Sequence, residues 1–314
     1  MKRLFCALCA LLLLSGCAPS APTQEDTLTI TATTYPLYLF ALDITENIPN
    51  VKVERLDTGS VSCLHDYTLS VNDMKKIERS DVLALNGVGL EDFMSDALAA
   101  TDVVVIDCSE GVELLPAAGH HDHDHGGDDH GHFDPHYWMD PLRAQTMVDN
   151  LRVGLSEVLP EYKDLLWENT VDNTLDAAWH MALRLLEEED VTIPGLITFH
   201  DGFQYFTDTL DLPLLRAVEE EAGSEASAKE MDEIIQLVKE KNIPVIFTET
   251  NGSDATAKAI ARETGCTVAQ LSMIMDGPEP SEDDSPSAPY EELFLNNIYT
   301  LIKGFAGREV LSAP

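Results

Sequence analysis

Histidine is the side chain in this sequence whose number and spacing could support chemistry. The chain of 314 residues holds ten histidines, and seven of them fall within residues 119–136, interleaved with aspartate. Neutral imidazole combined with carboxylate suits a borderline-soft divalent cation such as Zn²⁺. The pattern indicates metal binding, and the question is which histidines form a defined site.

Four short segments carry the candidate ligands, and each follows or adjoins the end of a predicted strand. The four are SCLHDY (62–67), DPHYWMDP (134–141), TFHDGF (198–203) and SMIMDG (272–277). In open α/β sheets, ligands gather at the ends of the strands. His65, His136, His200 and Asp276 could therefore converge in one cleft, and three imidazoles with one carboxylate suit tetrahedral zinc.

The histidines of residues 119–136 divide into two kinds. His136 follows Asp-Pro and precedes Tyr-Trp, which is an ordered context, whereas the six others lie among Gly and Asp with nothing apolar to pack them. We interpret the six as an accessory loop that binds zinc weakly, because each captured ion must also order the chain. They are His120, His121, His123, His125, His130 and His132. The alternative is a polar insertion without consequence.

The elements that would position these residues alternate between short β-branched segments and amphipathic helices. Strands are expected at 28–34, 51–57, 81–87, 103–107, 195–199, 244–249 and 266–272. This alternation predicts an α/β protein with parallel sheets flanked by helices. Residues 160–189 open with Pro160 and contain no further Pro or Gly, which predicts one long helix, on the order of 40 Å, connecting two lobes. A crossover helix within one continuous sheet is the alternative.

The first residues predict an exported lipoprotein. Lys2 and Arg3 precede an apolar run that is too short to span a bilayer, and the sequence LSGC ending at Cys17 resembles a bacterial lipobox. A secretory signal with a chance cysteine is the alternative. The expected division is a signal peptide (1–16), a lipidated tether (17–27), a first lobe (28–159) with the loop 119–132, a connector helix (160–189) and a second lobe (190–314). We expect a lipid-anchored protein at the outer face of the bacterial cell membrane.

The charge balance excludes one class of partner. With 19 Lys and Arg against 56 Asp and Glu, the formal net charge is -37. A nucleic-acid partner would need a basic surface. The three cysteines beyond Cys17 are Cys63, Cys108 and Cys266, an odd and widely spaced set that is no disulfide framework. We expect a monomer that attracts cations.

In order and spacing, these motifs resemble the cluster A-I (cluster 9) substrate-binding proteins of bacterial zinc and manganese ABC transporters. The resemblance rests on HDY, on DPHYWMDP behind a histidine-rich loop, on FHDGF, and on the SAKEMDEII helix leading to FTET, and it covers essentially the whole mature chain. It implies two Rossmann-like lobes joined by one long helix, with one metal ion bound between them.

Carried over by position, the resemblance implies that His65, His136 and His200 are metal ligands. Asp276 matches a late carboxylate that binds metal in some members, while others use water or another acid. Manganese-selective members tend to carry an acidic residue at the position of His200, so this histidine favours Zn²⁺ over Mn²⁺.

Other polar residues lie close to these positions in the sequence. Asp66 and Asp201 directly follow candidate ligands, and Glu249 ends a strand; each could contact a ligand or line the cleft, or be an ordinary solvated acid. His180 lies beside Trp179 within the predicted connector helix, and we expect it to be structural.

The expected function is high-affinity capture of Zn²⁺ outside the cytoplasm and delivery to an ABC permease. The alternatives are a manganese-binding homologue, a metal-dependent adhesin and a zinc-buffering lipoprotein. A zinc hydrolase is disfavoured because a fourth protein ligand is available, no HExxH segment occurs and no Ser/His/Asp arrangement is evident. We therefore expect binding and not catalysis.

Deleting residues 119–132 tests whether the six loop histidines are accessory to the tight metal site. We expect one tightly bound Zn²⁺ per chain with or without the loop, and loss of only the weaker additional equivalents on deletion, because the loop must be ordered by each ion it binds. Metal content and zinc titration of the two purified forms measure this. If the tight equivalent disappears with the loop, the division is wrong.

Overall fold

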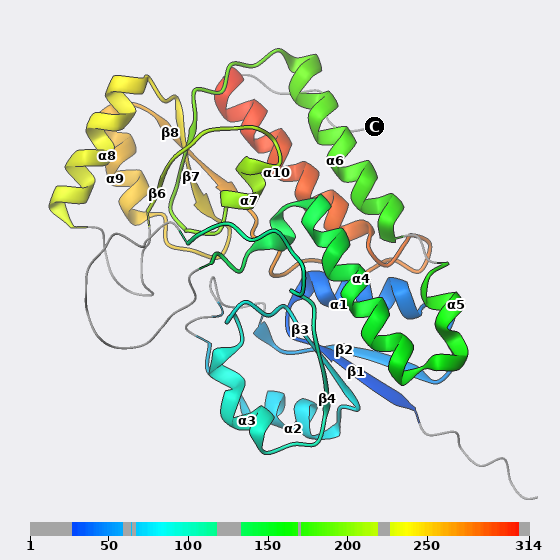
Figure 1. The fold of residues 1–314 in the computed structure, drawn as a ribbon. Helices are drawn as coiled ribbons and strands as arrows, with labels where there is room; N and C mark the ends of the chain where they lie inside the picture. The colour runs from blue at the N-terminus through cyan, green and yellow to red at the C-terminus, as the bar shows by residue number, and fades with distance from the viewer. Residues whose placement is uncertain are drawn as a thin grey trace, which may run out of the picture.

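The computed structural model describes residues 27–58, 64, 67–117, 133–168, 171–218 and 227–307. Within these residues the chain forms two lobes, each built on a four-stranded parallel sheet with helices packed against it (Figure 1). The expected α/β class with two parallel sheets is confirmed. None of the helices described is both long and apolar enough to cross a membrane.

The first lobe contains a sheet with the strand order β2-β1-β3-β4. Its strands are β1 (Leu28–Ala32), β2 (Val51–Arg55), β3 (Val82–Leu85) and β4 (Val104–Asp107), and its helices are α1 (Tyr35–Thr45), α2 (Val71–Arg79) and α3 (Ser95–Ala99). The central strand β3 has the sequence VLAL and is buried throughout, as a parallel strand covered on both faces requires. Helix α2 begins with a capping box between Ser70 and Asp73.

The second lobe repeats this arrangement with the strand order β6-β5-β7-β8. Its elements are β5 (Leu196–Thr198), α7 (Gln204–Asp208), β6 (Leu214–Ala217), α8 (Ala228–Lys241), β7 (Val245–Glu249), α9 (Ala255–Thr264) and β8 (Thr267–Leu271). The capping box expected between Ser227 and Glu230 is present at the start of α8. The seven strands predicted from the sequence are all found, whereas β6 was not predicted. Its sequence, LLRA, lacks the β-branched residues that mark the other strands.

The connector helix differs from its predicted bounds. Residues 160–189 do not form one helix: a short 3-10 turn (Pro160–Tyr162) and α5 (Lys163–Leu166) come first, and α6 spans Val171–Glu189. The chain turns at Trp167 because α5 folds back onto α4 (Pro141–Val158), where Arg152 stacks on the Trp167 ring at 5.2 Å and pairs with Asp172 at 3.0 Å. A helix can end without Pro or Gly when tertiary contacts of this kind stabilise a turn in the chain.

The chain also returns across the two lobes through the last helix that the structure describes, α10 (Ala288–Ala306), which packs along α6 (Figure 1). Ser285 and Ser287, just before α10, both donate hydrogen bonds of 2.6 Å to the buried carboxylate of Asp43 in α1. At the other end, Gly304 lies so close to Val245 of β7 that a Cβ would come within 2.9 Å of its side chain. Helix α10 therefore begins against the first lobe and ends against the second.

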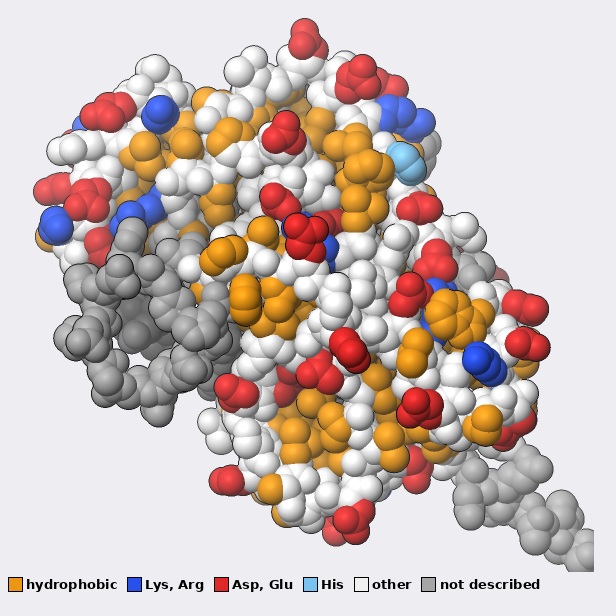
Figure 2. Space-filling model, in the orientation of Figure 1, with side chains coloured by type: hydrophobic (Ala, Val, Ile, Leu, Met, Phe, Trp, Pro, Cys, Tyr) orange, Lys and Arg blue, Asp and Glu red, His pale blue; other side chains and the backbone are white. Residues whose placement is uncertain are grey.

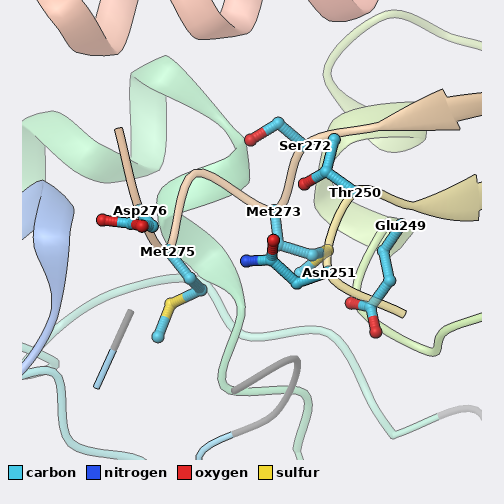
Figure 3. Close-up of a pocket in the computed structure, with 7 residues that line it drawn as sticks. All are labelled: Glu249, Thr250, Asn251, Ser272, Met273, Met275 and Asp276. Carbon is cyan, nitrogen blue, oxygen red and sulfur yellow. The ribbon is translucent and has the colours of Figure 1, made fainter. Parts of the chain in front are cut away.

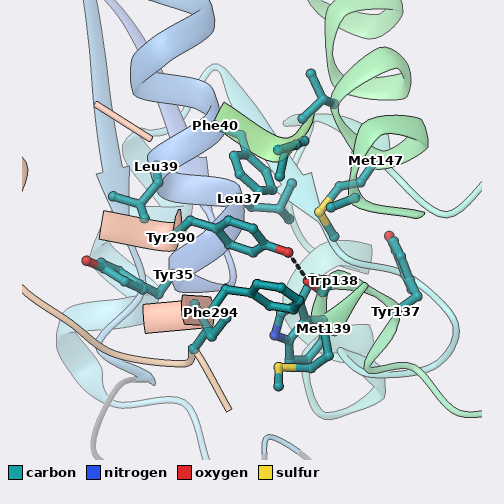
Figure 4. Close-up of a cluster of buried hydrophobic side chains, with 14 of the residues drawn as sticks. Tyr35, Leu37, Leu39, Phe40, Tyr137, Trp138, Met139, Met147, Tyr290 and Phe294 are labelled. Atoms are coloured by element: carbon teal, nitrogen blue, oxygen red, sulfur yellow. Dashed lines mark hydrogen bonds between the residues drawn. The ribbon is translucent and has the colours of Figure 1, made fainter. Parts of the chain in front are cut away.

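An aromatic cluster fills the space between these helices. Tyr290 and Phe294 of α10 stack with an interplanar angle of 8°, and Phe40 of α1 lies 5.3 Å from Tyr290, centroid to centroid (Figure 4). The Tyr290 hydroxyl donates to the carbonyl of Trp138 at 2.7 Å. Buried aromatic contacts of this kind join the segment around residue 138 to both α1 and α10.

A buried carboxylate, Glu91, organises the carboxyl ends of β1 and β3. It accepts hydrogen bonds from the Thr33 hydroxyl at 2.6 Å and from the backbone N–H groups of Asn86 and Gly87 at 2.8 and 3.0 Å. Asn86 in turn donates to the Pro135 carbonyl at 3.0 Å. Burial raises the pKa of Glu91 from 4.5 to about 7, against the opposing effect of the three donors.

Substituting Glu91→Gln should change how stability depends on pH. A folded-state pKa above the unfolded value means that the folded protein binds the extra proton, so the wild type loses stability as pH rises from about 4.5 to about 7. The glutamine does not titrate, so the variant does not lose this stability. The difference between its free energy of unfolding and that of wild type should therefore increase by about 3 kcal/mol between pH 4.5 and about pH 7. Urea unfolding across the pH range measures the difference, with exposed Glu46→Gln as the control. Parallel pH profiles for wild type and Glu91→Gln would contradict it.

Candidate metal site

His136 lies at the start of the 3-10 turn Tyr137–Met139, just before α4, and is only 4% exposed. Its Nδ1 lies 2.7 Å from Oδ1 of Asp134, which also accepts from the His136 backbone N–H at 2.9 Å. Because a carboxylate can only accept, the imidazole donates through Nδ1–H. The lone pair is then on Nε2, which is the arrangement of a metal-ligating histidine.

Asp134 is itself held by the second lobe. Gln204 of α7 donates to its Oδ2 at 3.0 Å, and the Tyr205 hydroxyl donates to its carbonyl at 2.7 Å. The Tyr205 oxygen also accepts from the N–H of Leu115 at 2.9 Å. The side chain of Asp134 is 2% exposed, so these contacts are shielded from water.

His200 follows β5 and faces His136 across the two lobes. The two imidazole rings lie 5.4 Å apart, centroid to centroid, with an interplanar angle of 81°. Nδ1 of His200 lies 3.9 Å from Oε2 of Glu249 at the end of β7, which is within ion-pair range but beyond hydrogen-bonding distance. The structure thus places two histidines from distant segments of the chain beside each other.

Residues 272–277, which we term the crossing segment, run from the end of β8 past both histidines. The Trp138 indole N–H, two residues after His136, donates to the Met273 carbonyl at 2.9 Å. On the other side, a Cβ on Gly202 would come within 2.3 Å of Met273 Cε and 2.9 Å of His200 Cδ2. Asn297 of α10 holds the start of the segment through two hydrogen bonds of 2.8 Å to the backbone of Ser272.

A small pocket of about 10 Å³ lies between the crossing segment and the end of β7. Figure 3 shows Glu249 on one side of Met273 and Asp276 on the other, with the Asp276 carboxylate directed away from Glu249. A volume of this size holds about one water-sized particle. Glu249 and Asp276 both line this pocket, whereas His136 and His200 do not.

Asp276 is engaged elsewhere in this structure. Its Oδ1 pairs with Nη2 of Arg55 at 2.9 Å, and its side chain is 46% exposed. Among the described residues, no group of three or more His, Cys, Asp or Glu side chains is arranged to hold a metal ion. The predicted ligand set is therefore represented here by His136 and His200 together, with Asp276 turned to an arginine.

Several predicted residues lie outside the described part of the chain. They are His65, Asp66, Cys17, Cys63 and the loop histidines His120, His121, His123, His125, His130 and His132. The residues flanking the loop pair with each other: Pro116 forms an antiparallel bridge with Phe133, and Asp134 N–H donates to the Leu115 carbonyl at 2.9 Å. These contacts join the two described segments on either side of the loop, next to His136.

The remaining predictions have separate outcomes. Asp201 lines a different, larger cavity of about 620 Å³ together with α7 and β6. His180 is exposed on α6, with its ring 4.9 Å from that of Trp179. Asp134, Gln204 and Arg55 were not identified from the sequence. Of the three, only Asp134 could have been found from the sequence, because it stands two residues before the candidate ligand His136.

Comparisons with known proteins give a family model that covers most of the chain. The sequence model of the ZnuA family, described as zinc-uptake complex component A, periplasmic, matches residues 30–304. The zinc-binding lipoprotein AdcA of Streptococcus pneumoniae (strain ATCC BAA-255 / R6) is 28% identical over 313 residues, which cover 96% of this chain and 60% of AdcA. The chain thus spans about three fifths of the length of that relative.

Solved structures show the same fold at lower sequence identity. A zinc-bound deletion mutant of ZnuA has a TM-score of 0.73 at 22% identity, covering 91% of this chain and all of that one. The laminin-binding protein Lmb of Streptococcus agalactiae, described as bifunctional with adhesin and metal-transporting activity, has a TM-score of 0.72 at 22% identity, covering 88% of this chain and 99% of Lmb.

Substituting Asp134→Asn should weaken metal binding without unfolding the protein. The amide keeps the size of the carboxylate but lowers the basicity of the imidazole that it orients, and loss of such a partner typically costs about 10- to 100-fold in metal affinity. Competition with a zinc chelator measures the affinity, and Asp96→Asn, exposed on α3 of the same lobe, is the control. Equal affinities for all three proteins would show that Asp134 does not position His136.

Proposed function

The chain belongs to the ZnuA family, the periplasmic A component of a zinc-uptake complex, and from this premise we propose that it captures Zn²⁺ outside the cytoplasm and delivers it to an ABC permease. The observation that carries the proposal is the pair of imidazoles, His136 and His200, brought from separate lobes to a ring separation of 5.4 Å. Two neutral imidazoles at this spacing favour zinc over harder cations.

The proposed ligands are His65, His136 and His200, with a carboxylate completing the tetrahedron. Asp276 is the proposed fourth ligand, and Glu249 is the alternative because its carboxylate lies 3.9 Å from His200. Asp134 would hold His136 with Nε2 toward the ion, so this ligand needs no reorientation when zinc arrives. Capture would then require the crossing segment to adjust so that a carboxylate reaches the ion.

Electrostatics support a cationic cargo. The net charge is -37, and acidic side chains are spread over the face shown in Figure 2, with few Lys and Arg side chains among them. A negative field raises the local concentration of cations and their rate of arrival. We propose that the loop histidines add a weak collecting site beside the tight one, rooted at the paired residues Pro116 and Phe133.

The proposed setting follows from the same family. We propose that Cys17 carries a lipid that holds the protein at the outer face of the bacterial cell membrane, where it works as a monomer. A permease would recognise the zinc-loaded form, and release would take place on the permease. The protein is in this view a carrier and not a hydrolase, because all coordination positions of the ion are taken by the chain.

Replacing the paired histidines tests the proposal. His136→Ala and His200→Ala should each lower zinc affinity by more than about 100-fold. Removing a residue that only hydrogen-bonds to a zinc ligand already lowers metal affinity by about 10- to 100-fold. Isothermal titration and chelator competition on the purified mature domain measure the loss.

His180→Ala is the matched control because His180 is exposed on α6, apart from the paired rings. It should bind one zinc ion as tightly as wild type. The proposal fails if wild type shows no tight 1:1 zinc binding, or if the three alanine variants bind zinc alike.

A further inference from the structure

Arg55 forms an ion pair with Asp276, the carboxylate that we propose as the fourth metal ligand. Zinc capture alone does not explain why an arginine stands there. Arg55 ends β2 in the first lobe, and its Nη2 lies 2.9 Å from Oδ1 of Asp276 in the crossing segment. The two side chains are 24% and 46% exposed, so the pair is partly open to solvent. A chain with 19 basic residues against 56 acidic ones places one of its few cations at this position.

Arg55 is held in this position by two tyrosines of α1. Its guanidinium carbon lies 4.9 Å from the ring centroid of Tyr35 and 5.8 Å from that of Tyr38. A guanidinium over an aromatic face is stabilised by the ring quadrupole, and the stacking limits its rotation. The arginine is therefore preorganised to meet a carboxylate.

The same tyrosines hold the chain on the far side of Asp276. The Tyr35 hydroxyl donates to the Pro278 carbonyl, and the Tyr38 hydroxyl donates to Oε2 of Glu279 at 2.7 Å. Gly277 packs so closely on Tyr35 that a Cβ would come within 2.7 Å of its hydroxyl. The residues directly after Asp276 are therefore held against the first lobe.

Between its two anchors the crossing segment is strained. Ile274 has φ of +56°, although it is β-branched and fully buried. This left-handed conformation is an outlier for such a residue, and its energy must be offset by the contacts on either side. Those contacts are Trp138 with Met273 on the histidine side and Arg55 with Asp276 on the other.

We infer that Arg55 and Zn²⁺ are alternative partners of Asp276, so that Arg55 is an affinity-determining residue of the metal site. This inference rests on the proposed function. The Asp276 carboxylate is held by Arg55 until an ion between the histidines takes it, and breaking the ion pair lowers the net affinity for zinc. On release, the arginine recovers the carboxylate and favours departure of the ion.

Removing Arg55 should therefore tighten zinc binding. For Arg55→Gln we expect affinity higher by about two- to fivefold, the range that a partly exposed ion pair supplies. Chelator competition measures it. The matched control is Arg79→Gln: Arg79 ends α2 in the same lobe and pairs with Glu54, the neighbour of Arg55. The control carries the same charge change and should leave the affinity within twofold of wild type.

A double substitution separates competition from simple repulsion between two cations. In an Asp276→Asn background, Arg55→Gln should no longer change zinc affinity. The same tightening in that background, or no tightening in the wild-type background, would overturn the inference. Arg55→Lys, which keeps the charge but loses the planar fork, is the second variant if circular dichroism shows that Arg55→Gln is unfolded, and it should tighten binding less but in the same direction. Unchanged or weaker binding by a folded Arg55→Lys would overturn the inference.

The outcome also separates this inference from the function on which it rests. If wild type binds zinc tightly and His136→Ala abolishes this, the proposed function stands whatever Arg55 does. If wild type shows no tight zinc equivalent, both fail together.

Discussion

The carboxylate of Asp134 is the contact on which the rest of the site depends. One of its oxygens accepts hydrogen bonds from the backbone and ring N–H groups of His136, and the other accepts one from the Gln204 amide. These donors come from different lobes, so a single buried acid fixes the direction of an imidazole and the position of α7 at once. Since α7 follows His200 by four residues, orientation of the first histidine and placement of the second are not independent. A buried carboxylate with this many donors is stable only when all of them are in place.

Much of the fold was predictable because its signals are local. Seven strands, the capping box at Ser227 and the pairing of α/β lobes follow from periodicity and helix-start residues within short windows. What failed depends on tertiary contacts. The break near Trp167 arises from Arg152, fifteen positions earlier in the chain, and β6 is a strand because it lies beside β5, not because LLRA favours extension.

The site shows the same division between local and distant information. His136 and His200 were recognised by their motifs. His200 follows the end of β5 as expected, whereas His136 directly follows none of the described strands and stands at the start of the 3-10 turn before α4. Arg55 carried no motif, since its relation to Asp276 spans 221 positions of sequence. An ion pair of this kind leaves no trace in spacing or periodicity, so only the folded chain reveals it. The family resemblance also located Asp276 without indicating that another side chain would compete for it.

Helix α10 bears on how fast an ion can enter or leave. Because it is fastened to Asp43 at one end and packs on β7 at the other, wide separation of the lobes would break buried contacts at both ends. Large hinge motions of proteins take microseconds to milliseconds, whereas exposed side chains rotate in picoseconds to nanoseconds. In the proposed function, a body braced in this way would exchange Zn²⁺ by rearranging a few residues at its surface, on the timescale of local torsions and not of whole-domain motion.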